Sequence, residues 1–308
     1  MCKYSAGSIN FMANVAVLGS TGMLGSTLTR VLQSKFNTIH EFNRSGISVT
    51  GINNSEVFDV GRISSLSSVF INKEIDYIIN CTGMIRQLIN VNNPDDIVLA
   101  QRINSEFLVE LEEFSSKSGI RVIQIGTDCV YSGKLGKYSE KDTSDPIDVY
   151  GITKNLGEKA SISSMLIRCS IIGREVHTSN SLMEWVLKQP LGAKINGYTN
   201  HIWNGVTTLH FSQIVSGIIK SNSFKAGVQH LIPKNIISKY ELLNLIAQNF
   251  ERHDLQISKF EADIAIDRSL TTNNFEQNLQ FWQLGGYNEI PTIDEMVSTY
   301  SRWYPLHN

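Results

Sequence analysis

The chain has 308 residues, of which 42% are hydrophobic, and its formal net charge is −2. This length and composition can bury a large core, and they fit one large α/β unit or two domains. Without a basic block or an apolar run of ~18 residues, the chain has no feature typical of nucleic-acid binding or a membrane helix, so we predict neither partner.

A glycine-rich turn follows the first predicted strand. Residues 14–18 form a short apolar and β-branched run, which suits a buried parallel strand. Gly19, Gly22 and Gly25 then follow a G-x-x-G-x-x-G spacing, before a helical pattern over 26–32. The first glycine permits a tight turn, the second lets the backbone approach a pyrophosphate, and the third allows close helix packing. With a helix N-terminus favouring phosphate, the turn predicts a nucleotide site.

Strands and helices alternate through the following residues. Since strands separated by helices imply a parallel sheet with right-handed crossovers, we predict an α/β fold with a Rossmann-type doubly wound sheet. Ligands of such sheets bind beyond the carboxyl ends of the strands, where the glycine turn, Thr82, Thr127 and Tyr150 would gather. We predict strands at 38–43, 76–81, 121–126 and 165–168, and a further strand that ends over 57–60. We predict three helices in this part of the chain: one that carries Leu66, Val69 and Phe70, one over about 97–118, and one around Tyr150.

The alternating pattern weakens after about residue 172. Helices near 181–188, 209–221 and 239–251 mix with short apolar runs, as in a smaller substrate-holding lobe. We therefore predict a dinucleotide-binding domain over 1–172 and a mainly substrate-binding C-terminal lobe over 173–308. The chain is free to recross between the two.

Tyr150 and Lys154 form the most informative pair in the sequence. Their i, i+4 spacing places both side chains on one helix face, about 5–6 Å apart. Because a nearby ammonium favours phenolate, we expect the pKa of Tyr150 to fall from about 10 towards neutrality. Such a tyrosine can exchange a proton with a sugar carbonyl or hydroxyl. The same spacing is common in exposed helical pairs, but the glycine turn and Thr127, which closes an apolar strand, favour a catalytic pair.

Together these motifs resemble the extended short-chain dehydrogenase/reductases, and within them most the dTDP-4-dehydrorhamnose reductases. The resemblance covers about residues 13–170 well and the remainder loosely. It rests on the glycine turn, on Asp59-Val60, on Tyr138-Ser139-Glu140 with Pro146, and on the segments 79–83, 126–131 and 150–158.

The resemblance implies a catalytic set of Thr127, Tyr150 and Lys154. Tyr150 would give a proton to the substrate oxygen, Thr127 would hydrogen-bond the same oxygen, and Lys154 would lower the tyrosine pKa and hold the nicotinamide ribose. Hydride would come from the cofactor. Asp59 would contact adenine or cap its strand, and Asn104 would bend its helix or be a solvated polar residue. The predicted cofactor-binding residues are Gly19, Thr21, Gly22, Met23, Leu24, Gly25, Asn43, Arg44, Ser45, Asp59, Val60, Cys81, Thr82, Gly83, Tyr150 and Lys154.

The end of the second strand predicts the cofactor. NAD-preferring Rossmann proteins place an acid there, whereas this chain has Asn43, Arg44 and Ser45. An uncharged Asn43 would not repel a 2′-phosphate, and Arg44 can pair with it. We therefore predict NADPH rather than NADH, although Glu41 would restore an acid if the register slipped by two residues.

Two departures from the family concern the substrate. Cys129 stands where the related 4,6-dehydratases carry glutamate, and a thiol with a pKa of about 8.5 is a poor replacement. The dTDP-4-dehydrorhamnose reductases usually have an aromatic there, and residues 168–171 lack their tryptophan. Arg268 would clamp a diphosphate or form a surface salt bridge. The predicted substrate-binding residues are Asp128, Cys129, Asn204 and Arg268.

These features predict an NADPH-dependent reductase of a nucleotide-activated 4-keto-6-deoxy sugar in surface-polysaccharide synthesis. One alternative is a nucleotide-sugar epimerase with the same residues. Another is a non-catalytic partner, like the regulatory subunit of methionine adenosyltransferase. We further expect reduced cysteines, a cytoplasmic location, no metal site and a homodimer. We also expect residues 1–11 to contribute little to stability or activity.

Overall fold

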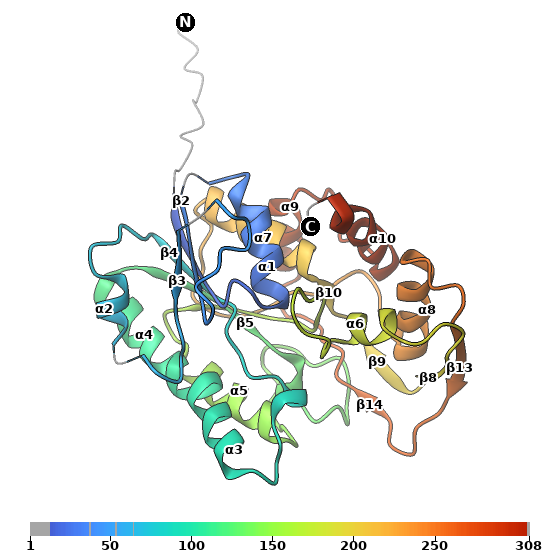
Figure 1. Ribbon diagram of the computed structural model, residues 1–308. Helices are drawn as coiled ribbons and strands as arrows, with labels where there is room; N and C mark the ends of the chain where they lie inside the picture. Colours follow the sequence, from blue (N-terminus) through green and yellow to red (C-terminus); the bar gives the residue numbers. More distant parts are fainter. Residues whose placement is uncertain (1–12, 37, 53, 64, 307–308) are drawn as a thin grey trace, which may run out of the picture.

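A parallel sheet forms the centre of the computed structural model, which describes residues 13–36, 38–52, 54–63 and 65–306. Within these residues the sheet has seven strands in the order β11-β6-β5-β4-β1-β2-β3, and every neighbouring pair is parallel (Figure 1). The strands are β1 (Asn14–Leu18), β2 (Thr38–Asn43), β3 (Asn54–Val57), β4 (Tyr77–Asn80), β5 (Arg121–Gly126), β6 (Met165–Arg168) and β11 (Gly227–His230). Residues 1–11, which we expect to contribute little to stability or activity, lie outside the described part.

Helices cover both faces of the sheet (Figure 1). Strand alternation divides β1 between two apolar cores, with Val15 and Val17 on one side and Ala16 and Leu18 on the other. The predicted doubly wound α/β fold is therefore confirmed. The first face carries α1 (Met23–Gln33), α7 (Thr208–Lys220) and α9 (Phe275–Leu284), and the second carries α2 (Leu66–Phe70), α3 (Pro94–Gln101), α4 (Phe107–Ser118) and α5 (Val149–Ala160).

Small sheets and three helices form the region beside the main sheet, on the right of Figure 1. Its hydrophobic side chains continue the first of the two cores. The elements are β7 (Ile171–Ile172), α6 (Leu182–Leu187), β8 (Lys194–Tyr198), β9 (His201–Trp203), β10 (Val206–Thr207), β12 (Ile237–Ser238), α8 (Lys239–Asn249), β13 (Gln256–Phe260), β14 (Ile266–Asp267) and α10 (Ile293–Trp303). Along the described chain, short 3₁₀ turns occur at Arg86–Leu88, Asp128–Val130 and Tyr304–Leu306.

Residues after 172 also complete the main sheet, because β11 pairs with β6 and α7 packs against α1. The domain boundary at residue 172 stays a prediction. None of the helices in the described part of the chain is long and apolar enough to span a membrane.

Two element predictions needed correction, and two helices were not predicted. The strand predicted to end over 57–60 ends at Val57, and the helix over 97–118 is interrupted by a π-helical turn, Arg102–Glu106. The sequence analysis did not predict α9 and α10. Their apolar residues, such as Phe281 and Tyr300, are buried against elements distant in sequence.

Candidate active site

The glycine turn forms a cradle that only glycine fits. Gly19 has φ +76°, and a Cβ there would lie 3.1 Å from the Cys81 carbonyl. A Cβ on Gly25 would lie 2.1 Å from the Gly19 carbonyl oxygen, so the α1 helix can approach the turn only without a side chain. The turn is tied to β2 because the Gly19 and Ser20 amides both donate to the Phe42 carbonyl, at 2.7 and 3.2 Å.

The first turn of α1 is open to a phosphate. Its N-cap Gly22 makes no side-chain capping bond, and the turn holds no acidic side chain. Helix N-terminal amides such as those of Met23 and Leu24 have no partner within the helix, and they favour anions. Gly22 is exposed, Thr21 and Met23 are half-buried, and Leu24 is buried. The cradle and its charge therefore fit a dinucleotide phosphate.

Five further predicted cofactor-binding residues follow β3 and β4, strands that β1 and β2 separate in the sheet. Asp59 accepts from the Gly61 amide at 3.0 Å and pairs with Arg62 at 3.5 Å, while Val60 is buried. Thr82 donates from its hydroxyl to Asn80 at 2.6 Å, and exposed Gly83 follows it. Burial raises the pKa of Cys81 to about 12, so this cysteine is a neutral packing residue.

Asn43 organises the loop after β2 instead of facing solvent. Only 2% of it is exposed, and its amide donates to Ser20 at 2.9 Å and to Ser55 at 3.1 Å. Its carbonyl oxygen accepts from both the amide and the hydroxyl of Ser45. Ser45 is thereby held in place, whereas Arg44 is exposed and pairs with none of the described side chains.

Glu41 lies inside β2, opposite Val17 in the register, and is fully buried. Its carboxylate accepts from the Ser48 hydroxyl and the Val49 amide, both at 2.7 Å. The register slip considered in the sequence analysis therefore does not occur, and the acid holds the 48–50 loop.

Thr127 and Tyr150 meet beyond the carboxyl end of β5. The Thr127 hydroxyl donates to Asp128 at 3.3 Å and is close enough to the Tyr150 phenol to lower its pKa, and only 6% of Thr127 is exposed. Helix α5 begins at this point because Asp148 caps it, accepting from the Gly151 amide at 2.8 Å. A Cβ on Gly151 would lie 2.3 Å from the Cys129 carbonyl oxygen, so this glycine lets the helix approach the threonine segment.

Lys154 lies one helical turn after Tyr150 and is 6% exposed. Its ammonium donates to the Ile125 carbonyl at 3.1 Å. Glu158, a further turn on, accepts from the Thr127 amide at 3.1 Å. One face of α5 thus carries three polar residues that are fastened to the end of β5.

The expected fall in the Tyr150 pKa is wrong for this structure. Burial raises the pKa of the phenol, the neighbouring Cys129 raises it further, and only the Thr127 hydrogen bond opposes them. Lys154 is not among the main groups that shift the pKa of the phenol, and burial lowers the pKa of its own ammonium. Tyr150 is consequently held as the protonated phenol, which is the form that a proton donor requires.

Asn104 lies in the π-helical turn between α3 and α4 and is 1% exposed. Its amide group bonds the amide and carbonyl of Met84, each at 2.9 Å, and the Thr153 hydroxyl at 3.1 Å. The interpretation as a solvated residue is therefore wrong. A Cβ on Gly157 would lie 2.3 Å from the Asn104 carbonyl oxygen, so the distorted turn packs closely against α5.

Two of the predicted substrate-side residues, Asp128 and Arg268, lie beside Cys129. Its Sγ lies 3.8 Å from an Asp128 oxygen and 4.0 Å from a guanidinium nitrogen of Arg268. Burial and Asp128 raise the Cys129 pKa to about 12, so it is a thiol at neutral pH and a poor acid/base. Asn204 is turned away, since its amide bonds both the amide and the carbonyl of Leu270. It holds the Arg268 segment.

Comparison with known proteins decides the family. The family described as RmlD substrate binding domain matches residues 13–192. The chain belongs to this family. The resemblance to extended short-chain dehydrogenase/reductases, and within them to dTDP-4-dehydrorhamnose reductases, is thereby confirmed.

Three similar proteins give the range of the likeness. A dTDP-4-dehydrorhamnose reductase of Aggregatibacter actinomycetemcomitans is 23% identical over 241 residues, which cover 75% of this chain and 76% of the relative. Methionine adenosyltransferase 2 subunit beta of Bos taurus is 27% identical over 156 residues, which cover 49% and 43%. The crystal structure of dTDP-4-dehydrorhamnose reductase from Bacillus anthracis, in complex with NADP, superposes with a TM-score of 0.74 at 18% identity and covers 94% of this chain and 98% of that one.

Two features of the site have no motif in the sequence. Arg168 pairs with Glu158 at 2.6 Å, and both side chains are at least nine-tenths buried. A buried ion pair therefore supports the segment that carries Thr127. Lys239, at the start of α8, lies near Asp128 and Cys129. For the ion pair, the sequence offered only the i, i+4 spacing that places Glu158 on the same helix face as Lys154. For Lys239, no neighbouring residue in the sequence indicated a role in the site.

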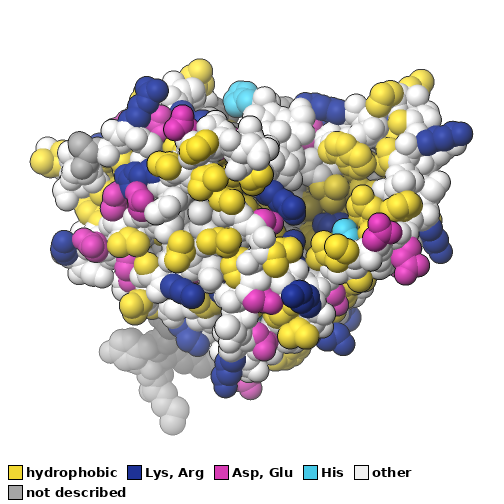
Figure 2. Space-filling view, turned by 90° about the horizontal axis from the view of Figure 1, so that it is seen from below, with side chains coloured by type: hydrophobic (Ala, Val, Ile, Leu, Met, Phe, Trp, Pro, Cys, Tyr) yellow, Lys and Arg dark blue, Asp and Glu magenta, His cyan; other side chains and the backbone are white. Residues whose placement is uncertain are grey.

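Figure 2 shows acidic and basic side chains interspersed over one face of the molecule, with a hollow where basic and hydrophobic side chains meet.

Among the described residues, no group of three or more His, Cys, Asp and Glu side chains is placed to hold a metal ion.

Proposed function

We propose that the chain is an NADPH-dependent reductase of a nucleotide-activated 4-keto-6-deoxy sugar, serving surface-polysaccharide synthesis. The observation that supports this most is the placement of Thr127 beside Tyr150 at the carboxyl edge of the sheet, with Lys154 one turn further on and fastened to the Ile125 carbonyl. The dTDP-4-dehydrorhamnose reductase relatives support the substrate class.

When bound, the nicotinamide supplies the hydride. The residues of this chain then act on the oxygen of the sugar carbonyl. The Thr127 hydroxyl donates a hydrogen bond to it, and Tyr150, kept protonated by burial, gives it a proton. Lys154 is placed one turn from the phenol to hold the ribose hydroxyls and to stabilise the phenolate that forms, because its charge then has a partner.

The direct test is a panel of nucleotide-activated 4-keto sugars with NADPH, followed by nicotinamide absorbance and NMR of the product. We expect one nucleotide sugar to be reduced with one NADPH consumed per product. Interconversion of two sugars without net NADPH oxidation would identify an epimerase instead.

The relative described as methionine adenosyltransferase 2 subunit beta supports a second candidate, a partner subunit without turnover. Thr127, Tyr150 and Lys154 are all present and brought together, which favours chemistry. Absence of turnover with every sugar in the panel, together with co-purification with a methionine adenosyltransferase, would favour the subunit.

We predict that the chain performs no 4,6-dehydration of a nucleotide hexose. The related 4,6-dehydratases carry a glutamate for the elimination where this chain has Cys129, and the thiol there has a pKa of about 12. A nucleotide hexose incubated with the protein and NAD should therefore give no 4-keto-6-deoxy product by NMR. Detection of that product would show that another base replaces the missing glutamate.

We predict that Arg44→Ala weakens NADPH binding by about 1.5–3 kcal/mol, the range for charged hydrogen bonds, and leaves NADH binding nearly unchanged. The exposed guanidinium follows β2 directly, where a 2′-phosphate would lie, and no described side chain competes for it. Titration calorimetry with both cofactors measures the difference. Arg302→Ala, which removes an exposed arginine of α10 whose side chain bonds Ser298, is the matched control. Equal loss for both cofactors in Arg44→Ala would contradict the assignment.

A further inference from the structure

His230 is the last residue of β11, and its side chain joins two distant parts of the chain. Only 2% of the residue is exposed. Its ring Nδ1 lies 2.7 Å from the Thr271 carbonyl oxygen, and its Nε2 lies 3.0 Å from Nη1 of Arg168. Because a carbonyl oxygen only accepts and a guanidinium only donates, the ring is neutral and carries its proton on Nδ1. Burial and the charge of Arg168 favour the same form, since they lower the pKa of His230 to about 4.

On one side, a series of hydrogen bonds leads from His230 to Thr127. The Arg168 guanidinium donates to one oxygen of Glu158, from Nε at 3.1 Å and from Nη2 at 2.6 Å. The other Glu158 oxygen accepts from the Thr127 amide at 3.1 Å. A guanidinium is a rigid plane, so the acceptor at Nη1 helps to fix the edge that holds Glu158. The His230 ring and the Tyr131 hydroxyl are the two acceptors there.

On the other side, His230 holds the segment 268–273, which follows β14 and begins with a predicted substrate-binding residue. The ring bond to the Thr271 carbonyl is the first attachment. The second runs through the backbone, because the His230 amide donates to Glu140 at 3.3 Å and Glu140 accepts from the Thr272 hydroxyl at 2.6 Å. The end of β11 therefore fixes where this segment lies.

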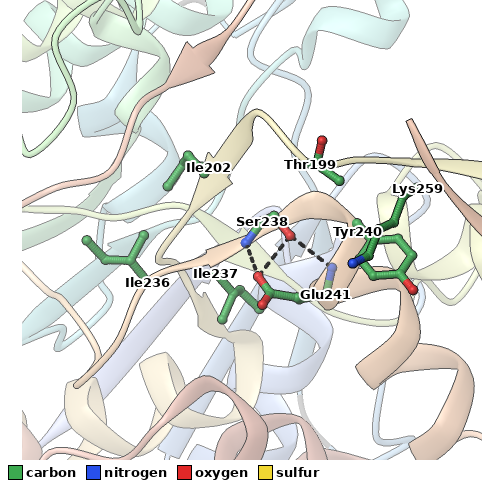
Figure 3. A pocket seen from close by; sticks show the side chains of 8 residues that line it. All are labelled: Thr199, Ile202, Ile236, Ile237, Ser238, Tyr240, Glu241 and Lys259. Atoms are coloured by element: carbon green, nitrogen blue, oxygen red, sulfur yellow. Dashed lines mark hydrogen bonds between the residues drawn. The ribbon is translucent and has the colours of Figure 1, made fainter. Parts of the chain in front are cut away.

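No ligand cavity explains these bonds of His230. Residues 236–238, which follow β11, line the cavity of about 370 Å³ that Figure 3 shows. A second cavity, of about 360 Å³, lies at the amino ends of β4 and β5, around Tyr77 and Arg121. His230 lines neither of them, and its amide and both ring nitrogens are bonded within the protein. It is therefore placed to act on other residues and not on a ligand.

We propose that His230 is a positioning residue, which fixes the Thr127 hydroxyl relative to the segment 268–273. The inference rests on the proposed function for the reaction that it affects. Because negative charge develops on the carbonyl oxygen during reduction, a hydrogen bond from Thr127 gains strength in the transition state. A misplacement of about 1 Å can cost about a hundredfold in rate. The KM for NADPH should change little, because the Gly19 turn is bonded to β2 and not to this network.

Two substitutions separate the two bonds of the ring. The amide nitrogen of Asn can take the place of Nδ1, so His230→Asn keeps the bond to Thr271 and loses the bond to Arg168. The amide oxygen of Gln can take the place of Nε2, so His230→Gln keeps only the bond to Arg168. We expect His230→Asn to lower kcat about ten- to a hundredfold, with the KM for the sugar nearly unchanged. His230→Gln should mainly raise the KM for the sugar, and His230→Leu should do both.

The amide NMR signals of Thr127 and Thr271 give a second readout, which needs no substrate. We expect the Thr127 signal to move in His230→Asn and His230→Leu, and the Thr271 signal to move in His230→Gln and His230→Leu. His210→Asn is the matched control, since His210 is 1% exposed and its Nδ1 bonds the Thr207 hydroxyl at 2.7 Å. It should lower the melting temperature without moving either signal or changing kcat.

The proposal is overturned if His230→Asn and His230→Leu fold and leave the Thr127 signal and kcat as in the wild type. It is also overturned if His210→Asn, at a similar loss of melting temperature, lowers kcat and moves the Thr127 signal as much. Should His230→Leu not fold, the Asn and Gln variants carry the test, because each keeps one bond. A wild type that turns over no sugar would contradict the proposed function, and the two amide signals would still decide whether His230 positions Thr127.

Discussion

Tyr150→Phe should lower turnover by about 10²–10⁴-fold, the range that a positioned proton donor contributes. The substitution removes only the phenol hydroxyl, which lies beside Thr127. Because the ring remains on the capped start of α5, the fold and the affinity for NADPH should be nearly unchanged. The measurements are the steady-state rate with the reduced sugar identified by the panel, the melting temperature and calorimetric cofactor titration.

Lys154→Ala is the informative companion variant, since it should lower both turnover and cofactor affinity. Ile152→Ala, on the exposed side of the same helix, serves as the control and should change neither. A Tyr150→Phe protein that kept more than a few per cent of the wild-type rate would show that another group donates the proton.

Arg168→Leu should destabilise the protein by about 3–5 kcal/mol, because it leaves the Glu158 carboxylate buried without its partner. The pair is 2.6 Å long, and the guanidinium also bonds the Tyr131 hydroxyl and the His230 ring, at 2.9 and 3.0 Å. Turnover of the remaining folded protein should fall as well, since Glu158 fastens the Thr127 amide. Urea unfolding and the steady-state rate below the unfolding transition measure the two effects.

A surface ion pair provides the comparison. Lys117 lies 3.6 Å from Glu113, and their side chains are 78% and 65% exposed, so Lys117→Leu should change the free energy of unfolding by less than about 1 kcal/mol. Equal effects of the Arg168 and Lys117 substitutions would mean that the buried pair is not needed for stability. Replacing both Glu158 and Arg168 by apolar residues should recover part of the lost free energy, because no buried charge then remains unpaired.

Local spacing determined the features that sequence analysis predicted correctly. A strand followed by Gly19, Gly22 and Gly25 has few structural solutions, since the turn needs a positive φ at the first glycine and a close approach at the third. Tyr150 and Lys154 share a helix face for the same reason, because four residues nearly complete one turn. The strands at 38–43, 121–126 and 165–168 were predicted at their observed bounds, as their apolar runs are short and sharply ended.

Only the tertiary structure decided the protonation of Tyr150 and the surroundings of the substrate-side residues. The sequence gives the lysine four residues away, but it does not give the burial that raises the pKa of the phenol. Likewise Asp128, more than a hundred residues before Lys239, and Arg268, beyond α8, β13 and β14, both act on the Lys239 ammonium, and no spacing rule relates them to it. The sequence by itself determined the fold class and the residues of the candidate catalytic set, because those depend on neighbours along the chain. The charge state and the partners of these residues were decided by burial and by contacts between distant segments, which the chain acquires only when the sheet and its helices pack together.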